Sequence, residues 1–93
     1  MSKEIHKKTL SYLFKEILSG NKNFDVRLAD WQCETGDILI LDEIDDETKV
    51  LTGRSIRKKV GYILSTKETN FYSKKEIEKY GLQVISLLEE KEL

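Results

Sequence analysis

The apolar positions of the chain recur with two different spacings, and these spacings predict helices and strands. Between residues 9 and 19 they recur every three or four residues, which is the pattern of a helix that buries one side. The positions are Leu10, Leu13, Phe14, Ile17 and Leu18. Gly20 follows, where a helix commonly ends in a left-handed residue. The sequence therefore predicts a helix over 9–19.

The segment after this helix alternates between apolar and polar residues. Phe24, Val26 and Leu28 form the apolar set. A strand with this alternation places Asp25 and Arg27 together on the face opposite the core. Alternation of this kind is also typical of an ordinary half-buried strand with a solvated outer face.

A hairpin is predicted in the middle of the chain. Residues 38–41 are continuously apolar, which predicts a strand over 38–44 that is covered on both faces. An acidic loop over 42–49 then leads to a long strand over 50–64 that bends at Gly53. One side of this second strand is apolar and is interrupted by a single cation; its residues are Ile56, Lys58, Val60, Tyr62 and Leu64.

The two ends of the chain have weaker patterns. Residues 1–8 are polar and favour a loose N-terminal segment. Ser73 and Glu76 have the spacing of a capping box, which predicts a short helix over 73–80. Residues 82–88 are predicted to form a last strand.

Composition limits the classes of function. The 93 residues are enough for one domain, 1–93. Lys and Arg total 16 against 17 Asp and Glu, so any nucleic acid must meet a local basic patch and not an overall positive charge. Cys33 is the only cysteine, which excludes an internal disulfide and fits a cytoplasmic protein. No apolar run reaches transmembrane length, so no membrane partner is expected.

Charged and aromatic clusters leave several interpretations open. Four cations within residues 54–59 indicate either a phosphate-facing surface or an edge strand protected from aggregation. Trp31 could stack on a base, but a lone Trp in a loop more often caps a core. No glycine-rich phosphate loop, CxxC, HExxH or GxSxG motif is present, and the acidic loop lacks the spacing of a calcium site. No cofactor and no metal site are therefore expected.

The residues that follow the first helix resemble a known signature. Gly20, Lys22, Asp25 and Arg27 match the pattern GxKxxExR of the ASCH domains in the PUA-like superfamily, with Asp in the place of Glu. Residues 20–27 are called the signature segment below. A small bacterial and phage branch of unknown function is closer still, and its further matches run along nearly the whole chain: His6, Lys8, Tyr12, Phe14, Gly36, Asp37, Thr52, Gly53, Arg54, Val60, Tyr62, Ile63 and residues 80–87.

This resemblance implies an α+β fold in which a small PUA-like β-barrel is flanked by helices. ASCH domains are proposed to bind RNA in a cleft beside the barrel, lined by the signature residues. The chain is therefore expected to bind RNA or a nucleotide, with Lys22 neutralising phosphate. Arg27 either contacts phosphate or base edges, or pairs with Asp25 and holds the cleft in shape. Further contributors are expected at His6, Lys8 and Arg54.

Two other classes of function stay open. A few small relatives are hydrolases that remove acyl groups from acetylated cytidine with a Lys, a Thr and a Glu. Lys22 matches that Lys, Asp25 occupies the place of that Thr, and no residue matches the Glu. The alternative function is thus a nucleoside amidohydrolase with Lys22 and Asp25 as its catalytic pair. The third class is a phage or host interaction module without a nucleic-acid role.

Overall fold

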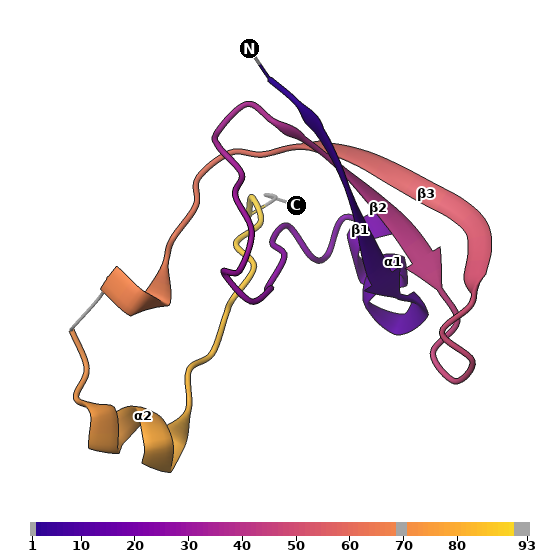
Figure 1. Cartoon of the computed structure of the whole chain (residues 1–93). Coiled ribbons are helices and arrows are strands. Elements are labelled where there is room, and N and C mark those ends of the chain that lie inside the picture. Colours follow the sequence, from indigo (N-terminus) through magenta and orange to yellow (C-terminus); the bar gives the residue numbers. More distant parts are fainter. Residues whose placement is uncertain (1, 69–70, 91–93) are drawn as a thin grey trace.

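A computed structural model describes residues 2–68 and 71–90 and has an α+β fold built on one three-stranded sheet (Figure 1). The strand order is β1-β2-β3, with β1 over Glu4–Leu10, β2 over Ile38–Ile44 and β3 over Leu51–Lys59. β1 and β2 are parallel, and α1 (Ser11–Leu18) begins their connection. β2 and β3 form an antiparallel hairpin. The helix and the hairpin are confirmed, and β2 has the predicted bounds.

β1 lies where the sequence favoured a loose segment, so that prediction is wrong. The strand pairs with β2 over its whole length, from Glu4 opposite Ile38 to Leu10 opposite Ile44. Its ladder is made by backbone groups, which do not depend on side-chain polarity. Its polar side chains are accommodated because one sheet face is open and because Thr9, on the other face, binds an arginine.

Three of the five buried apolar side chains among the described residues lie on the side of the sheet that α1 covers; the other two, Ile40 and Ile44, alternate to the opposite face of β2. Phe14 and Ile17 of α1 are buried, and Phe14 is only 1% exposed. They pack towards the face of β2 that carries Leu41, which is also buried. Side chains alternate along a strand, so Leu39, Leu41 and the buried Glu43 share this face. α1 therefore divides the sheet into a covered face and an open face.

β3 bulges at Gly53, where the sequence predicted a bend. Asp42 pairs with Ser55 and Ile44 with Leu51, so three residues of β3 stand opposite Glu43 alone. Gly53 has a φ of 96°, a conformation that side chains other than glycine rarely adopt. β3 ends at Lys59 and is shorter than the predicted strand over 50–64.

The predicted capping box is confirmed. α2 spans Lys74–Tyr80; the Ser73 hydroxyl accepts from the Glu76 N–H, and the Glu76 carboxylate accepts from the Ser73 N–H. A 3-10 turn, Thr66–Glu68, lies between β3 and α2. No residue of α2 is buried, so its cap and not packing stabilises it.

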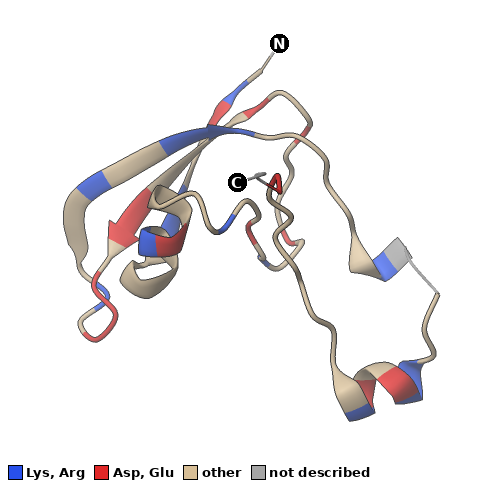
Figure 2. Cartoon of the chain, turned by 180° about the vertical axis from the view of Figure 1, so that it is seen from behind, with Lys and Arg blue, Asp and Glu red and all other residues tan. Residues whose placement is uncertain are grey.

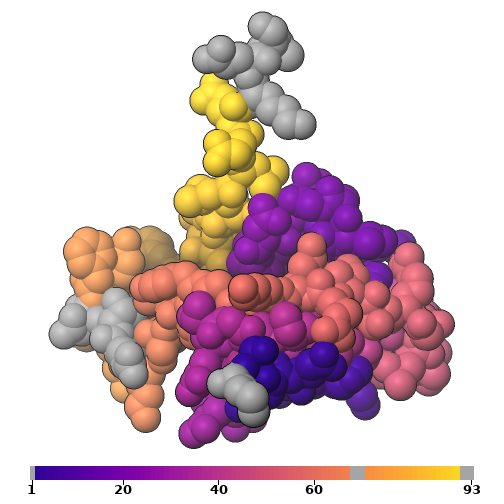
Figure 3. Space-filling model, turned by 90° about the horizontal axis from the view of Figure 1, so that it is seen from above, coloured from indigo at the N-terminus to yellow at the C-terminus, as the bar shows by residue number. Residues whose placement is uncertain are grey.

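Two predicted strands are wrong, and the barrel is not confirmed. Residues 24–28 and 82–88 are described without regular secondary structure. Val26 and Leu28 are exposed, because the signature segment is held by side-chain hydrogen bonds and not by a ladder. Segment 82–88 lies beside the signature segment, where the Asn23 N–H donates to the Ser86 hydroxyl (Figures 1 and 3). Among the described residues the sheet is open, with β1 and β3 as its edges.

Candidate functional site

A cavity of about 430 Å³ lies on the covered face of the sheet, and we call it the signature cavity. Ile17, Leu39 and Leu41 supply apolar lining. The signature segment contributes part of the wall, and residues 58–65 contribute another part. The size falls in the range of sites that take one small organic ligand, roughly 300–1,000 Å³.

The three charged residues of the signature meet in this cavity. Lys22 Nζ lies 3.8 Å from Asp25 Oδ1, and Arg27 Nε donates to Asp25 Oδ2 at 2.5 Å. All three side chains line the cavity. The prediction that Lys22 and Arg27 flank Asp25 in one concave site is confirmed, although the reasoning through a strand is not. Their role in binding stays a prediction.

All three nitrogens of the Arg27 guanidinium donate to the protein, through three of its five N–H groups. Besides Asp25, it donates from Nη1 to the Lys8 carbonyl at 3.0 Å and from Nη2 to the Thr9 hydroxyl at 2.9 Å. Of the two roles expected for Arg27, the structure has the one in which it pairs with Asp25 and holds the cleft in shape. The signature segment is thereby fastened to β1.

Lys22 is partly withdrawn from water. Its Nζ donates to the Phe24 carbonyl at 2.6 Å, and the ammonium lies 4.6 Å from the centre of the Phe24 ring. Burial lowers the pKa of Lys22 below its ordinary value; the charge of Asp25 opposes this shift and that of Arg27 adds to it. A lysine in these surroundings gives up its proton more readily than one at the surface.

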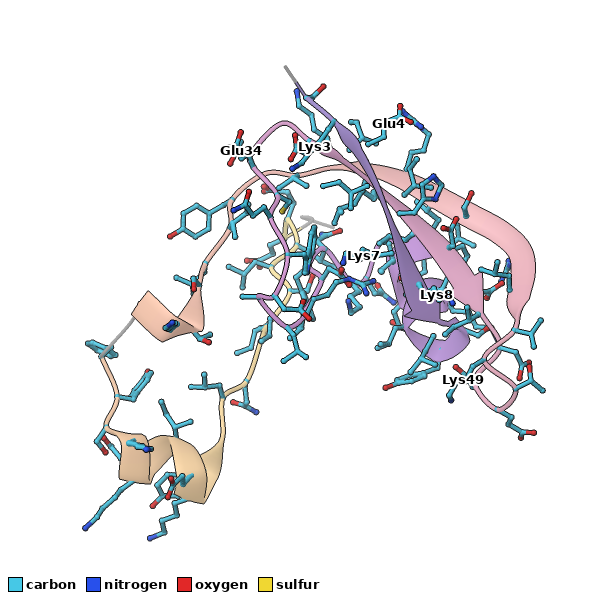
Figure 4. All side chains as sticks on the ribbon, in the orientation of Figure 1. Lys3, Glu4, Lys7, Lys8, Glu34 and Lys49 are labelled. Carbon is cyan, nitrogen blue, oxygen red and sulfur yellow. The ribbon has the colours of Figure 1, made fainter. Side chains whose placement is uncertain are left out.

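Three aromatic side chains also line the cavity: Phe24, Trp31 and Tyr62. Trp31 is half-buried and lines the cavity together with the core residues Ile17 and Leu41, so the preferred interpretation of a core cap stays a prediction. The Lys7 ammonium lies 4.0 Å from the centre of its ring, and Figure 4 shows Lys7 on the side of β1 that faces the segment after α1. Tyr62 is 89% exposed.

The further predicted contributors lie elsewhere. His6 and Lys8 share one side of β1, as expected for an extended segment, but alternation puts that side opposite Lys7 and the cavity. His6 Nδ1 lies 2.8 Å from Asp42 Oδ2 on the open face, where Glu4 also pairs with Arg57 (Figure 4). Neither His6 nor Lys8 lines the cavity, so the structure does not support the contribution predicted for them, which stays a prediction.

Arg54 also lies outside the cavity lining, because it serves a buried carboxylate. Glu43 is 2% exposed and accepts from Arg54 Nε and Nη2, both at 2.8 Å. The hydroxyls of Ser11 and Thr52 donate to it as well, at 2.7 and 2.6 Å. Hydrogen bonds from Arg54, Thr52 and Ser11 lower the pKa of Glu43 to about 2.

This Glu43 cluster was missed by the sequence reasoning. A usable signal existed, since Glu43 continues the alternation Leu39, Leu41 on the covered face. Because of the bulge at Gly53, the residues on either side of it, Thr52 and Arg54, both donate hydrogen bonds to the Glu43 carboxylate. Thr9 stands opposite Glu43 in the β1–β2 register, so the cluster adjoins the anchor of Arg27.

Charge is unevenly distributed over the molecule. Cationic residues gather along β3, and carboxylates gather at the tip of the β2–β3 hairpin (Figure 2).

Within residues 2–68 and 71–90, no group of three or more His, Cys, Asp or Glu side chains could hold a metal ion. In the same ranges, no helix is both long enough and apolar enough to cross a membrane.

Comparison with known proteins identifies one family. A family model described as a domain of unknown function, DUF3850, matches residues 5–77. The match includes β1 from Ile5 onwards, α1, the signature segment, β2 and β3. No curated protein and no solved structure matches the chain.

Proposed function

The chain belongs to the DUF3850 family, a domain of unknown function, and from the chemistry of the signature cavity we propose that it binds a nucleotide or a short single-stranded RNA there. The observation that carries the proposal is the composition of the lining. Three cationic side chains, Lys22, Arg27 and Lys58, accompany a single carboxylate, Asp25. Three aromatic residues are interleaved with them. Cations with aromatic surfaces are what proteins use to hold the phosphates and bases of single-stranded nucleic acid.

Each signature residue has a role in this proposal. An ammonium has three donors, and Lys22 directs them at the Phe24 carbonyl, at Asp25 and at the ligand. Arg27 acts through Asp25 and β1, keeping the signature segment in its bound shape. Such prior organisation lowers the conformational cost of binding.

The proposed relationship is to the ASCH domains, and the proposed complete fold is a PUA-like barrel. Two features support closure of the open sheet: β3 has a free edge, and segment 82–88 carries exposed Val84, Ile85 and Leu87 without a ladder partner among the described residues. Unpaired edges and exposed apolar strands are avoided in stable proteins. We also propose a cytoplasmic location, on the ground of the lone Cys33.

One observation favours a second candidate, the nucleoside amidohydrolase. The lowered pKa of Lys22 and the carboxylate 3.8 Å away form a pair that can exchange a proton. In this function, neutral Lys22, oriented by Asp25, takes a proton from water as the water oxygen bonds to the acyl carbon. The C–N bond then breaks, and the Lys22 ammonium returns the proton to the leaving cytidine nitrogen, which gives cytidine and the free acid. Turnover of an acetylated nucleoside would rise with pH up to the lowered pKa of Lys22.

The test uses the single tryptophan of the chain as a reporter, because Trp31 lines the cavity. Ribonucleotides and short RNAs are titrated at several salt concentrations, and acetylated cytidine is assayed for product. For a binder, Lys22→Ala weakens RNA affinity and reduces the slope of log affinity against log salt by roughly one phosphate contact. Lys8→Ala on the open face is the matched control. Turnover that disappears in Lys22→Ala would establish the hydrolase instead. If the protein shows no binding at low salt and no turnover, both functions are refuted.

A further inference from the structure

The cations that line the signature cavity differ in what they already bind. Arg27 has three protein acceptors, and Lys22 donates to the Phe24 carbonyl and lies near Asp25. Lys58 forms no ion pair with any residue that the structure describes. Its side chain is exposed and lines the cavity. Lys59 likewise forms no ion pair among the described residues, so these two adjacent lysines carry the charges that the protein itself leaves least balanced.

The register of the sheet directs Lys58 towards the cavity. Lys58 stands opposite Leu39, and both line the cavity on the covered face. Ile56, on the same side of β3, stands opposite the buried Leu41. Lys59 stands opposite Ile38, and alternation directs its side chain to the open face. Of the two adjacent lysines, only Lys58 carries its ammonium on the cavity side.

The rest of the lining suits the remainder of a nucleotide. Tyr62, four residues after Lys58, also lines the cavity, and its aromatic side chain is almost fully exposed. The cavity volume of about 430 Å³ fits one nucleotide unit and not a long strand. Lys22, Asp25 and Arg27 together carry one net positive charge and Lys58 adds a second, which favours a ligand with one phosphate group.

We propose that Lys58 is the phosphate anchor of the signature cavity, and that the ligand is a nucleotide bound through its phosphate and not an unphosphorylated nucleoside. This inference rests on the proposed function and adds to it the class of ligand and the residue that selects it. Lys58 supplies a charge-assisted hydrogen bond that only the phosphorylated form can accept. Discrimination arises because a phosphate offers the ammonium an anionic acceptor, whereas a nucleoside leaves it bound only to water.

The experiment compares the four ribonucleoside 5′-monophosphates with their nucleosides on the full chain. Trp31 fluorescence reports binding, and isothermal titration calorimetry measures the affinity independently. Wild type is expected to prefer the monophosphate by about tenfold, the equivalent of one charge-assisted hydrogen bond. In Lys58→Gln the preference falls severalfold, to what Lys22 alone supplies, while nucleoside affinity is unchanged. Inorganic phosphate should compete with the monophosphate more weakly in Lys58→Gln than in wild type.

Lys8→Gln is the matched control, because it removes an exposed lysine from the open face of β1. It should keep the preference of wild type. Circular dichroism should show Lys58→Gln to be folded, since the side chain is exposed. Equal monophosphate affinity in wild type and Lys58→Gln would overturn the anchor while leaving nucleotide binding intact. Binding of nucleosides as tight as that of monophosphates would overturn the class of ligand. The absence of binding to any probe would refute the proposed function itself.

Discussion

Replacing Arg27 by lysine tests whether this residue positions the site or contacts the ligand. Arg27→Lys keeps the positive charge and the possibility of an ion pair with Asp25. It removes the planar fork that reaches the Lys8 carbonyl and the Thr9 hydroxyl together. The signature segment then loses its direct fastening to β1. We expect the folded state to be destabilised even when no ligand is present.

The magnitude follows from the two bonds that are lost. A hydrogen bond contributes roughly 0.5–1.5 kcal/mol net, and bonds to charged groups contribute more. The Arg27 side chain is about one-fifth exposed, so partial solvation keeps each bond near the middle of the neutral range. The expected loss is about 2 kcal/mol. For a domain of this size, that corresponds to a fall in Tm of about 10 °C.

The assay is urea unfolding followed by Trp31 fluorescence and by far-UV circular dichroism, with thermal unfolding beside it. Arg57→Lys is the matched control. It is the same substitution in the ion pair between Arg57 and Glu4, and both side chains of that pair are more than half exposed. Exposed pairs contribute roughly 0–1 kcal/mol, so Arg57→Lys should change the midpoint little.

Two results would contradict the positioning role. If Arg27→Lys unfolds at the same urea concentration as wild type, the fork does not hold the segment. If stability is unchanged but nucleotide binding is lost, the guanidinium contacts the ligand directly. A fall in stability together with weaker binding supports the role argued from the structure.

Three further predictions concern the Glu43 cluster, the core and α2. The folded pKa of Glu43, about 2, lies below its ordinary value of 4.5, so the contribution of its carboxylate to stability is present above pH 4.5 and is lost as the pH falls towards 2. Glu43→Gln should therefore unfold at less urea than wild type at pH 7, and its urea midpoint should depend less on pH between 4.5 and 2. A pH profile of the midpoint equal to that of wild type would contradict this. Phe14→Ala should lower the free energy of unfolding by about 3–5 kcal/mol in thermal denaturation, since the ring is fully buried; a loss below about 1 kcal/mol would place the core elsewhere. Ser73→Ala should cost α2 about 1 kcal/mol and speed hydrogen exchange of the helix, with the urea midpoint of the sheet unchanged because α2 buries no residue; a shifted midpoint would show that α2 packs on the core.

Local patterns predicted the elements whose causes are local. The helical repeat around Phe14 and Ile17 predicted α1, and the apolar run with the acidic loop after it predicted the β2–β3 hairpin. The capping box produced α2, because a cap is formed by residues three positions apart. The α+β class follows from these elements.

The candidate site was predicted in part and for a partly wrong reason. Asp25 and Arg27 do lie together, but as a paired loop and not as one face of a strand. Alternation shows which side chains share a side, whereas a strand also needs a neighbour that offers a ladder. His6 and Lys8 were found on one side of an extended segment, yet the sequence did not determine which side faces the cavity.

The sequence by itself determined where α1, α2 and the hairpin form, and that charges of both signs follow α1 closely. Only the tertiary structure decided that polar residues 4–10 are a strand, because a ladder depends on the backbone of β2, which lies about thirty residues away in the chain. Only the tertiary structure decided that the side chains of Arg27 and Arg54 donate to protein acceptors, whereas Lys58 lines the cavity without an ion pair to a described residue. The physical reason is the same in each case: the free energy of a hydrogen bond or an ion pair depends on which groups the fold brings into contact, and sequence spacing fixes those contacts only within a few residues.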